Sequence, residues 1–175
     1  MPRINPVQNP TSEAQETLNG VNAKMGSVPN LFATLGHSNA ALTGYLQLGD
    51  TLGSGVLTAA QREQIALAVA QENECEYCLS AHVVIGTGAG LTPDDIAAAR
   101  RADEKDSIDS ALTHLARTLV KQQGLLNDQS FNEYRTAGLS DAQIIETAAN
   151  VALNTLTNYV NHLAETDIDF PVTRL

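Results

Sequence analysis

The chain has 175 residues and carries ten lysines and arginines against twenty aspartates and glutamates, which gives a formal net charge of −10. This acidic surplus repels phosphate backbones and anionic lipid headgroups, so neither nucleic acid nor a membrane surface is an expected partner. Hydrophobic residues make up 43% of the chain, which favours a folded globule, and the length suits a single domain over residues 1–175.

No apolar run approaches the roughly 18 residues that a membrane span needs. The first ten residues also lack the apolar stretch of a secretory signal. We therefore expect a cytoplasmic protein, in a compartment that keeps thiols reduced. The chain has two cysteines, Cys75 and Cys78, and a close pair there is more often catalytic or metal-binding than structural.

Capping residues and glycines divide the first part of the chain into helices. After an extended N-terminal arm, Ser12 with Gln15 resembles a capping box, and Pro29 suits the start of a later helix. Thr58 with Gln61 forms a second capping box. In chain order, the helices predicted here span about 12–25, 30–36, 38–53 and 59–72.

The cysteines lie at the start of the next predicted helix. Asn73 and Glu76 resemble another capping box, so this helix is expected to begin near Glu74 and to run to the glycine cluster at 86–90. A further helix is predicted to start at Thr92-Pro93. Three more are predicted over about 106–123, 128–136 and 141–165, and Ser140 with Gln143 caps the last of them.

No segment alternates as strands require, so the predicted fold class is all-α. The stretches L-T-A-A-Q (57–61) and L-S-D-A-Q (139–143) match at an offset of 82 residues and suggest a degenerate internal repeat, although capped Ala-rich helices resemble one another by chance as often. The D-F-P stretch (169–171) is expected to end in a loose tail.

The spacing of the cysteines predicts a reactive dithiol. With Asn73 as the N-cap, the cysteines lie in the first helical turn, where free N–H groups and the helix dipole stabilise a thiolate. Cys75 and Cys78 are i,i+3 neighbours, and Cys78 and His82 are i,i+4 neighbours, so all three share one face. A disulfide between the cysteines needs some distortion, which suits reversible redox turnover near a surface.

His82 is placed to hold or accept a thiol proton, and Glu63, twelve residues before Cys75, would store a proton or orient the imidazole if the helices pack suitably. The alternatives are a three-ligand zinc site at Cys75, Cys78 and His82, or a surface histidine and a solvated glutamate. Five further residues are weaker or structural candidates. Tyr77 would be core or site lining, Asn158 and His162 form an i,i+4 pair that could reach the site, and His162, like His37 and His114, is structural by default.

The sequence resembles the alkylhydroperoxidase D (AhpD)-like proteins of the carboxymuconolactone decarboxylase superfamily, through Glu63, the C-E-Y-C motif at 75–78 and His82. It is most similar to the peroxidase-related branch, where V-P-N-L-F (28–32), R-E (62–63), N-Y-V-N-H (158–162) and D-F-P (169–171) are also typical. The resemblance covers most of the chain and implies an all-helical fold and a homo-oligomer, with trimers, hexamers and dimers among the members.

The resemblance also implies an enzyme that reduces hydroperoxides, a peroxidase or disulfide reductase without haem, flavin or metal. Cys78 would attack the peroxide, Cys75 would resolve the sulfenic acid as a disulfide, and Glu63 with His82 would relay protons. A dithiol reductant, in the best-known members a dihydrolipoyl protein, would reduce the disulfide. Those members carry histidine where this chain has Tyr77.

Two questions remain open at this level. Helix-terminus reasoning favours Cys75 as the more acidic thiol, whereas the resemblance assigns the attack to Cys78; we follow the resemblance because His82 is spaced for Cys78. The alternative functions are a lactone-acid lyase of the decarboxylase type, which needs no cysteine pair, and a non-enzymatic zinc-binding or redox-sensing module.

Overall fold

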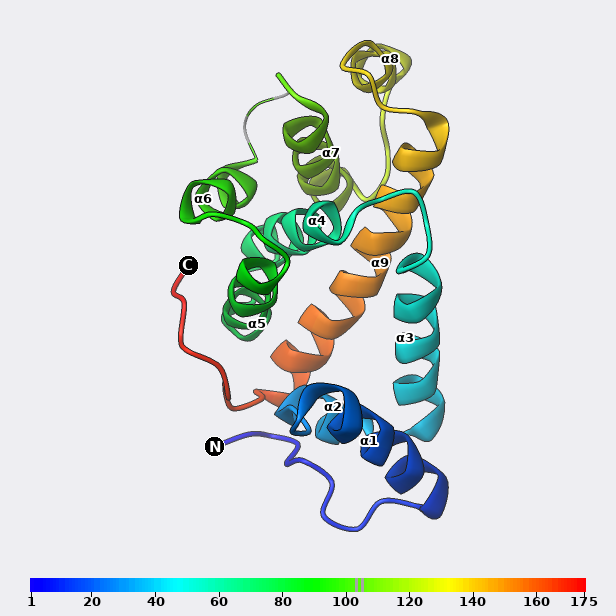
Figure 1. The fold of residues 1–175 in the computed structure, drawn as a ribbon, viewed down its shortest axis with the longest axis vertical. Coiled ribbons are helices and arrows are strands. Elements are labelled where there is room, and N and C mark those ends of the chain that lie inside the picture. The colour runs from blue at the N-terminus through cyan, green and yellow to red at the C-terminus, as the bar shows by residue number, and fades with distance from the viewer. Residues whose placement is uncertain (103, 105) are drawn as a thin grey trace.

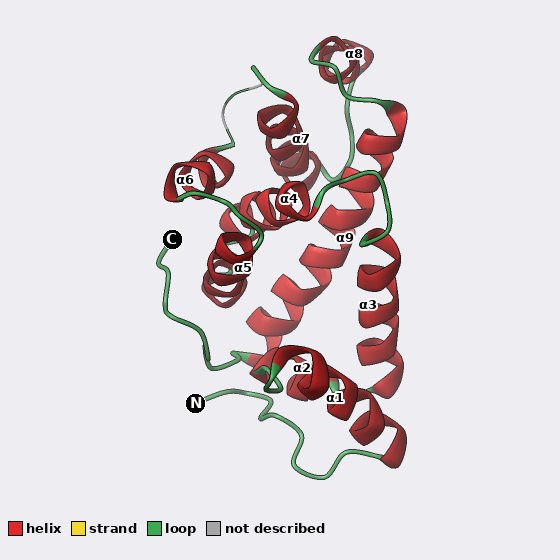
Figure 2. Cartoon of the chain, in the orientation of Figure 1, coloured by secondary structure: helices red, strands yellow, loops and turns green. Residues whose placement is uncertain are grey.

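A computed structural model covers residues 1–175 and describes all of them except 103 and 105. Every regular element in the described residues is a helix, as Figures 1 and 2 show, so the predicted all-α class is confirmed. The helices are α1 (Ser12–Met25), α2 (Asn30–Leu35), α3 (Asn39–Leu52), α4 (Ala59–Glu72), α5 (Glu76–Gly88), α6 (Pro93–Arg101), α7 (Ile108–Gln122), α8 (Asp128–Thr136) and α9 (Asp141–Ala164).

Side-chain caps set most of the helix starts. Thr58, Thr92 and Ser140 each form a capping box, in which the cap hydroxyl and the residue three positions later exchange hydrogen bonds with backbone N–H groups. The cap of α1 is Thr11, whose hydroxyl accepts from the Ala14 N–H. The prediction of Ser12 as the first cap is therefore wrong by one residue, because Thr11 already satisfies that N–H group.

Helix α4 lies in the middle of the fold and contacts α5, α6, α7 and α9 (Figure 1). Its side chains enter two apolar clusters. Leu67 and Ala70 pack with both cysteines and Leu79, while Ile65 and Val69 pack with residues of α7 and with Tyr134. A helix buried on several sides needs apolar residues around most of its circumference, which the run I-A-L-A-V-A (65–70) supplies.

Helix α9, the longest, has an unusual division of its faces. Its buried face is rich in amides and hydroxyls: Thr147, Asn150, Asn154, Thr157, Asn158 and Asn161. Its opposite face exposes a stripe of large apolar residues: Ile145, Leu156, Tyr159 and Leu163. Burial of polar groups is costly unless they are hydrogen-bonded, so the inner face of α9 marks a place where polarity is needed inside the fold.

The C-terminal residues do not form a loose tail, and that prediction is wrong. The Thr173 N–H donates to Ser80 Oγ at 2.9 Å, and Arg174 pairs with Glu76 at 2.6 Å, so the segment lies along α5. Asp169 accepts a hydrogen bond from the Asn30 N–H at 2.7 Å. These contacts place the segment over the helix that carries the cysteines (Figure 1).

The suggested repeat stays a prediction. Both α4 and α9 begin with a capping box, 82 residues apart as the repeat predicts. Helix α4 ends at Glu72, however, whereas α9 continues without interruption to Ala164. None of the described helices is both long and apolar enough to cross a membrane.

Candidate active site

The dithiol helix begins two residues later than expected. Cys75 itself is the N-cap of α5, and its Sγ accepts the Cys78 N–H at 3.4 Å. Glu74 adopts a left-handed conformation with φ of 57°, and the Cys75 N–H closes back onto Ala70 O at 2.8 Å. This tight turn joins α4 to α5, so the predicted capping box of Asn73 and Glu76 is wrong. Asn73 instead caps the end of α4.

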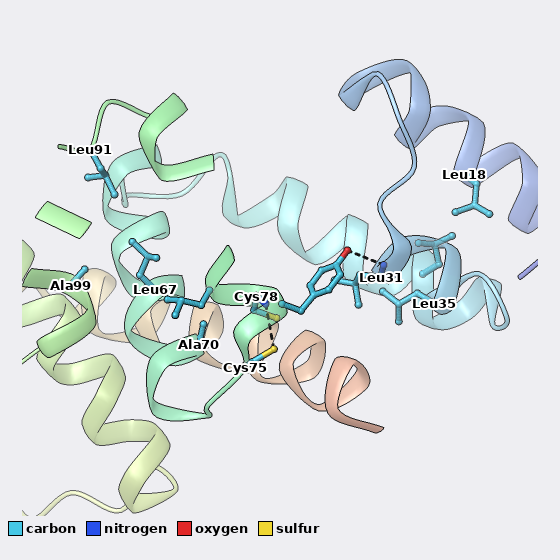
Figure 3. Packing of buried hydrophobic residues seen from close by; sticks show 12 residues of the cluster. Leu18, Leu31, Leu35, Leu67, Ala70, Cys75, Cys78, Leu91 and Ala99 are labelled. Atoms are coloured by element: carbon cyan, nitrogen blue, oxygen red, sulfur yellow. Dashed lines mark hydrogen bonds between the residues drawn. The ribbon is translucent and has the colours of Figure 1, made fainter. Parts of the chain in front are cut away.

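Both sulfurs are enclosed. Cys75 is 0% exposed and Cys78 is 2% exposed, and the two side chains face one another at the start of α5 (Figure 3). The expectation of a dithiol close to the surface is therefore wrong, because α9 and the C-terminal segment cover this end of the helix. The interior position removes water from the sulfurs and strengthens every electrostatic influence on them.

The two thiols have opposite acidities. The hydrogen bond with Cys75 is the largest influence on Cys78 and lowers its pKa, while burial raises it. The charge of His82 and two amides of α9 add to the lowering and bring the pKa of Cys78 to about 6. The same hydrogen bond, followed by burial, raises the pKa of Cys75. Helix-terminus reasoning, which favoured Cys75 as the more acidic thiol, is contradicted. Accepting the Cys78 N–H at the cap position acts to lower the pKa of Cys75, but the hydrogen bond between the two thiols and burial outweigh it.

Glu63 and His82 meet across the α4–α5 contact. Glu63 Oε2 lies 2.8 Å from His82 Nδ1, and both side chains are about one-sixth exposed, at 17% and 15%. Burial acts to lower the pKa of His82, but the charge and hydrogen bond of Glu63 outweigh it and raise that pKa overall. Gly86, at the same helix contact, permits the close packing of Leu91: a Cβ there would lie 3.0 Å from a Leu91 methyl, whereas its distance of 3.6 Å from Glu63 Cβ would be an ordinary contact.

Sequence reasoning missed Asn161, which makes the direct contact from α9. Its Nδ2 donates to Cys78 Sγ at 3.2 Å, and the residue is 4% exposed. Asn158, the predicted candidate one turn earlier, accepts from Asn73 Nδ2 at 2.8 Å and also lowers the pKa of Cys78. Asn154 hydrogen-bonds to His82 and helps to raise its pKa. The only available signal was the recurrence of asparagine along α9.

A cavity of about 50 Å³ borders Cys78, Ala81 and His82. Four aromatic side chains contribute to its wall: Phe32, Tyr45, Tyr77 and Phe170. Tyr77 is both core and site lining, because its hydroxyl accepts the Leu31 N–H at 3.1 Å (dashed line in Figure 3) while its ring packs edge-on against Phe170. Tyr45 was not singled out from the sequence. Burial, followed by the negative charges of Cys78 and Glu63, raises its pKa, so its hydroxyl stays protonated.

Cys75 borders a different opening. An open groove of about 500 Å³ is lined by Cys75, Asn161, His162 and residues of the C-terminal segment. His162 Nε2 lies 3.3 Å from Glu74 O, so His162 is beside the turn that carries Cys75 rather than beside Cys78. His37 and His114 hydrogen-bond to Asn5 O and to the Tyr134 hydroxyl.

Across the described residues, no group of three His, Cys, Asp or Glu side chains is arranged to hold a metal ion. The Cys75, Cys78 and His82 side chains do not form such a group, and His82 Nδ1 contacts Glu63. This arrangement favours a free dithiol over the three-ligand zinc alternative.

Comparison with known proteins gives a family match for part of the chain and solved structures with the same fold. Residues 39–121, from α3 to α7, match the carboxymuconolactone decarboxylase family. The fold is similar to that of a peroxidase-related protein from Ralstonia eutropha JMP134 described as an alkylhydroperoxidase AhpD core, with a TM-score of 0.81 and 25% identity over 95% of this chain and 93% of that chain. The fold of the chain is therefore AhpD-like, and its residues 39–121 are similar to the carboxymuconolactone decarboxylase family.

Two further structures share the fold. A peroxidase-related protein from Silicibacter sp. TM1040 has a TM-score of 0.80 and 21% identity, over 94% of this chain and 91% of that chain. The debrominase Bmp8, whose structure is known alone and with 2,3,4-tribromopyrrole, has a TM-score of 0.76 and 20% identity, over 95% of this chain and 91% of that chain. No match is found among curated proteins. The superfamily is enzymatic, and its fold serves more than one activity.

Proposed function

We propose that this AhpD-like protein is a thiol-dependent hydroperoxide reductase in which Cys78 attacks the peroxide. The observation that carries the proposal is the acidity of Cys78: with a pKa of about 6, about nine in ten Cys78 thiols are ionised at pH 7. The thiolate is the nucleophile in such chemistry, and reactive cysteines have depressed pKa values. Cys75 within hydrogen-bond reach supplies the second sulfur.

In the first step, the Cys78 thiolate attacks one peroxide oxygen, the S–O bond forms and the O–O bond breaks. Cys78 is oxidised to a sulfenic acid, and the electron pair leaves with the second oxygen as an alkoxide. His82, kept protonated by Glu63, donates a proton that converts the alkoxide to an alcohol. A protonated imidazole at this position therefore serves both the thiolate and the leaving group.

In the second step, Cys75 attacks the sulfenic acid, the S–S bond forms and water leaves. The raised pKa of Cys75 keeps its proton available for that water. An external dithiol then reduces the Cys75–Cys78 disulfide by thiol–disulfide exchange. It gives up two electrons and two protons, becomes a disulfide itself and restores both thiols. A dihydrolipoyl protein is the proposed reductant, in a cytoplasmic setting.

The two openings support a division of access. The aromatic cavity borders Cys78 and would admit the peroxide, while the groove at Cys75 lies on the other side of the dithiol and would admit the reductant. Since Cys75 is fully covered, reduction requires the groove to open. The lining of the cavity is mostly apolar, which favours organic hydroperoxides as the substrate class.

We also propose that the protein is a homo-oligomer that associates through the outer face of α9. Tyr159 and Leu163 are 62% and 65% exposed, and Ile145 and Leu156 extend the same stripe. Apolar side chains at this helical spacing form a continuous surface that a second copy would cover.

Two alternatives predict different behaviour. A lyase of the decarboxylase type would keep its activity after both cysteines are changed to serine. A zinc-binding or redox-sensing module would purify with stoichiometric zinc or would lack turnover with peroxide.

The test is stopped-flow oxidation of the reduced protein by cumene hydroperoxide, with free thiols counted before and after. The expected result is a fast loss of two thiols per chain with release of one equivalent of alcohol, abolished in Cys78→Ser. Equal rates in wild type and Cys78→Ser would reject the proposal.

A further inference from the structure

The buried amides of α9 are not equivalent. Asn150 and Asn154 donate their Nδ2 groups to carbonyls one turn earlier in the same helix, both at 2.8 Å. Asn158 and Asn161 reach across to the α4–α5 turn instead. At the end of α9 that lies beside Cys78, the amides of Asn158 and Asn161 therefore bond to Asn73 and Cys78 and not to carbonyls of their own helix.

Asn73 determines how the Asn158 amide is oriented. The Asn73 Nδ2 donates to Asn158 Oδ1 at 2.8 Å, which occupies the carbonyl side of that amide. The Nδ2 side is left buried and finds no hydrogen-bond partner among the described residues. An unpaired buried donor is costly, and such donors are rare in folded proteins.

An ionised Cys78 would give the unpaired Asn158 Nδ2 group a strong acceptor. A neutral thiol is a weak acceptor, whereas a thiolate accepts hydrogen bonds strongly. Asn158 lies close enough to Cys78 to lower its pKa, alongside the direct contact from Asn161. The titratable groups around this sulfur are Cys75, Tyr77 and His82 on α5, Glu63 on α4 and Tyr45 on α3.

We propose that the Asn158 side-chain amide donates a hydrogen bond to the Cys78 thiolate, completing with Asn161 a two-amide cradle, and that Asn73 is the positioning residue that aims it. The inference rests on the proposed function in one respect, that Cys78 is the reactive thiol. The cradle holds the negative charge before peroxide arrives and releases the sulfur when the S–O bond forms.

The experiment is a pH titration of Cys78 alkylation by iodoacetamide, followed site by site with peptide mass spectrometry on reduced full-length protein. Asn158→Leu removes the donor. Asn73→Ala leaves the donor in place but frees its orientation. Asn150→Leu is the matched control, since it removes a buried amide from the same face of α9, eight residues earlier, without touching the dithiol.

The wild-type midpoint is expected near 6. Asn158→Leu should raise it by about one pH unit, so that alkylation below pH 6 slows about tenfold. Asn73→Ala should raise it by less, and Asn150→Leu should leave it unchanged even if the protein melts earlier.

A folded Asn158→Leu protein with the wild-type midpoint would overturn the inference, as would an equal shift in Asn150→Leu. If Asn158→Leu does not fold, Asn73→Ala decides, because Asn73 is partly exposed and its truncation is the milder change. An unchanged midpoint there also overturns the inference. A wild-type midpoint near 9 would have a different meaning, since it would reject Cys78 as the reactive thiol and the cradle with it.

Discussion

Replacing Glu63 by Gln should disable the proton relay while keeping its shape. The carboxylate lies 2.8 Å from His82 Nδ1 in a site where both side chains are largely covered. Gln keeps the side-chain length and a hydrogen-bonding oxygen but removes the negative charge. Burial then dominates the ionisation of His82 and lowers its pKa, so the ring becomes neutral near pH 7 and no longer attracts the Cys78 thiolate.

The size of the effect follows from the hydrogen bond that is lost. Hydrogen bonds to charged groups contribute roughly 1.5–3 kcal/mol, which corresponds to about one to two pKa units. If the pKa of Cys78 rises by about one unit from about 6, the thiolate fraction at pH 5.5 falls from about 24% to about 3%, or about eightfold. At pH 9 both proteins are almost fully ionised, so the difference should nearly vanish.

The assay is the rate of oxidation by cumene hydroperoxide in stopped flow between pH 5 and pH 9. Glu72→Gln is the control, because Glu72 is on the same helix but pairs with Arg117 and Lys121. We expect Glu63→Gln to shift the acidic limb upward by at least one unit and Glu72→Gln to leave it in place. The same limb in all three proteins would refute the role of the Glu63–His82 pair.

His82 also links the site to folding stability. Its pKa is raised in the folded protein, so the charged pair stabilises fully below the unfolded pKa, and this contribution is lost as the pH rises through the folded value. Melting temperatures of wild type and Glu63→Gln should therefore differ most at mildly acidic pH and should converge as the pH rises through the folded pKa of His82. A difference that grows with pH would contradict this assignment of charges.

Three further predictions concern access and assembly. Ala81→Leu should fill the cavity beside Cys78 and slow oxidation by cumene hydroperoxide more than oxidation by hydrogen peroxide; equal slowing would contradict peroxide entry there. Deleting Val172–Leu175 removes contacts that hold the C-terminal segment on α5 and should speed disulfide reduction by dithiothreitol several-fold, with an unchanged rate counting against access at Cys75. Leu163→Glu should reduce the mass measured by light scattering to that of one chain, whereas a monomeric wild type would reject association through α9.

Helix positions were predictable because their signals are local. The capping boxes at Thr58 and Ser140 form as expected, Thr92 is the expected N-cap of α6, and α4 and α8 have the predicted bounds. A cap depends on residues three positions apart, so the sequence contains the whole interaction. The contact between Glu63 and His82 depends instead on how two helices pack, which their spacing left open.

The errors lie where distant segments compete for the same groups. Asn73 is a residue type that often forms N-caps, but its side-chain amide donates a hydrogen bond to Asn158, 85 residues away. The left-handed conformation of Glu74 then moves the N-cap of the next helix to Cys75. The acidities of the two thiols are reversed because the hydrogen bond between them lowers the pKa of Cys78 and raises that of Cys75, which outweighs the N-cap contact of Cys75. Asn161 was overlooked because the recurrence of asparagine along α9 does not indicate which of these amides faces a sulfur.

The most direct test of the account is chemical trapping of the first oxidised sulfur. Reduced Cys75→Ser and Cys78→Ser proteins are treated with one equivalent of cumene hydroperoxide in the presence of dimedone and mapped by mass spectrometry. The account predicts a dimedone adduct on Cys78 in Cys75→Ser and no adduct on Cys75 in Cys78→Ser. An adduct on Cys75 alone, with Cys78 unmodified, would contradict it.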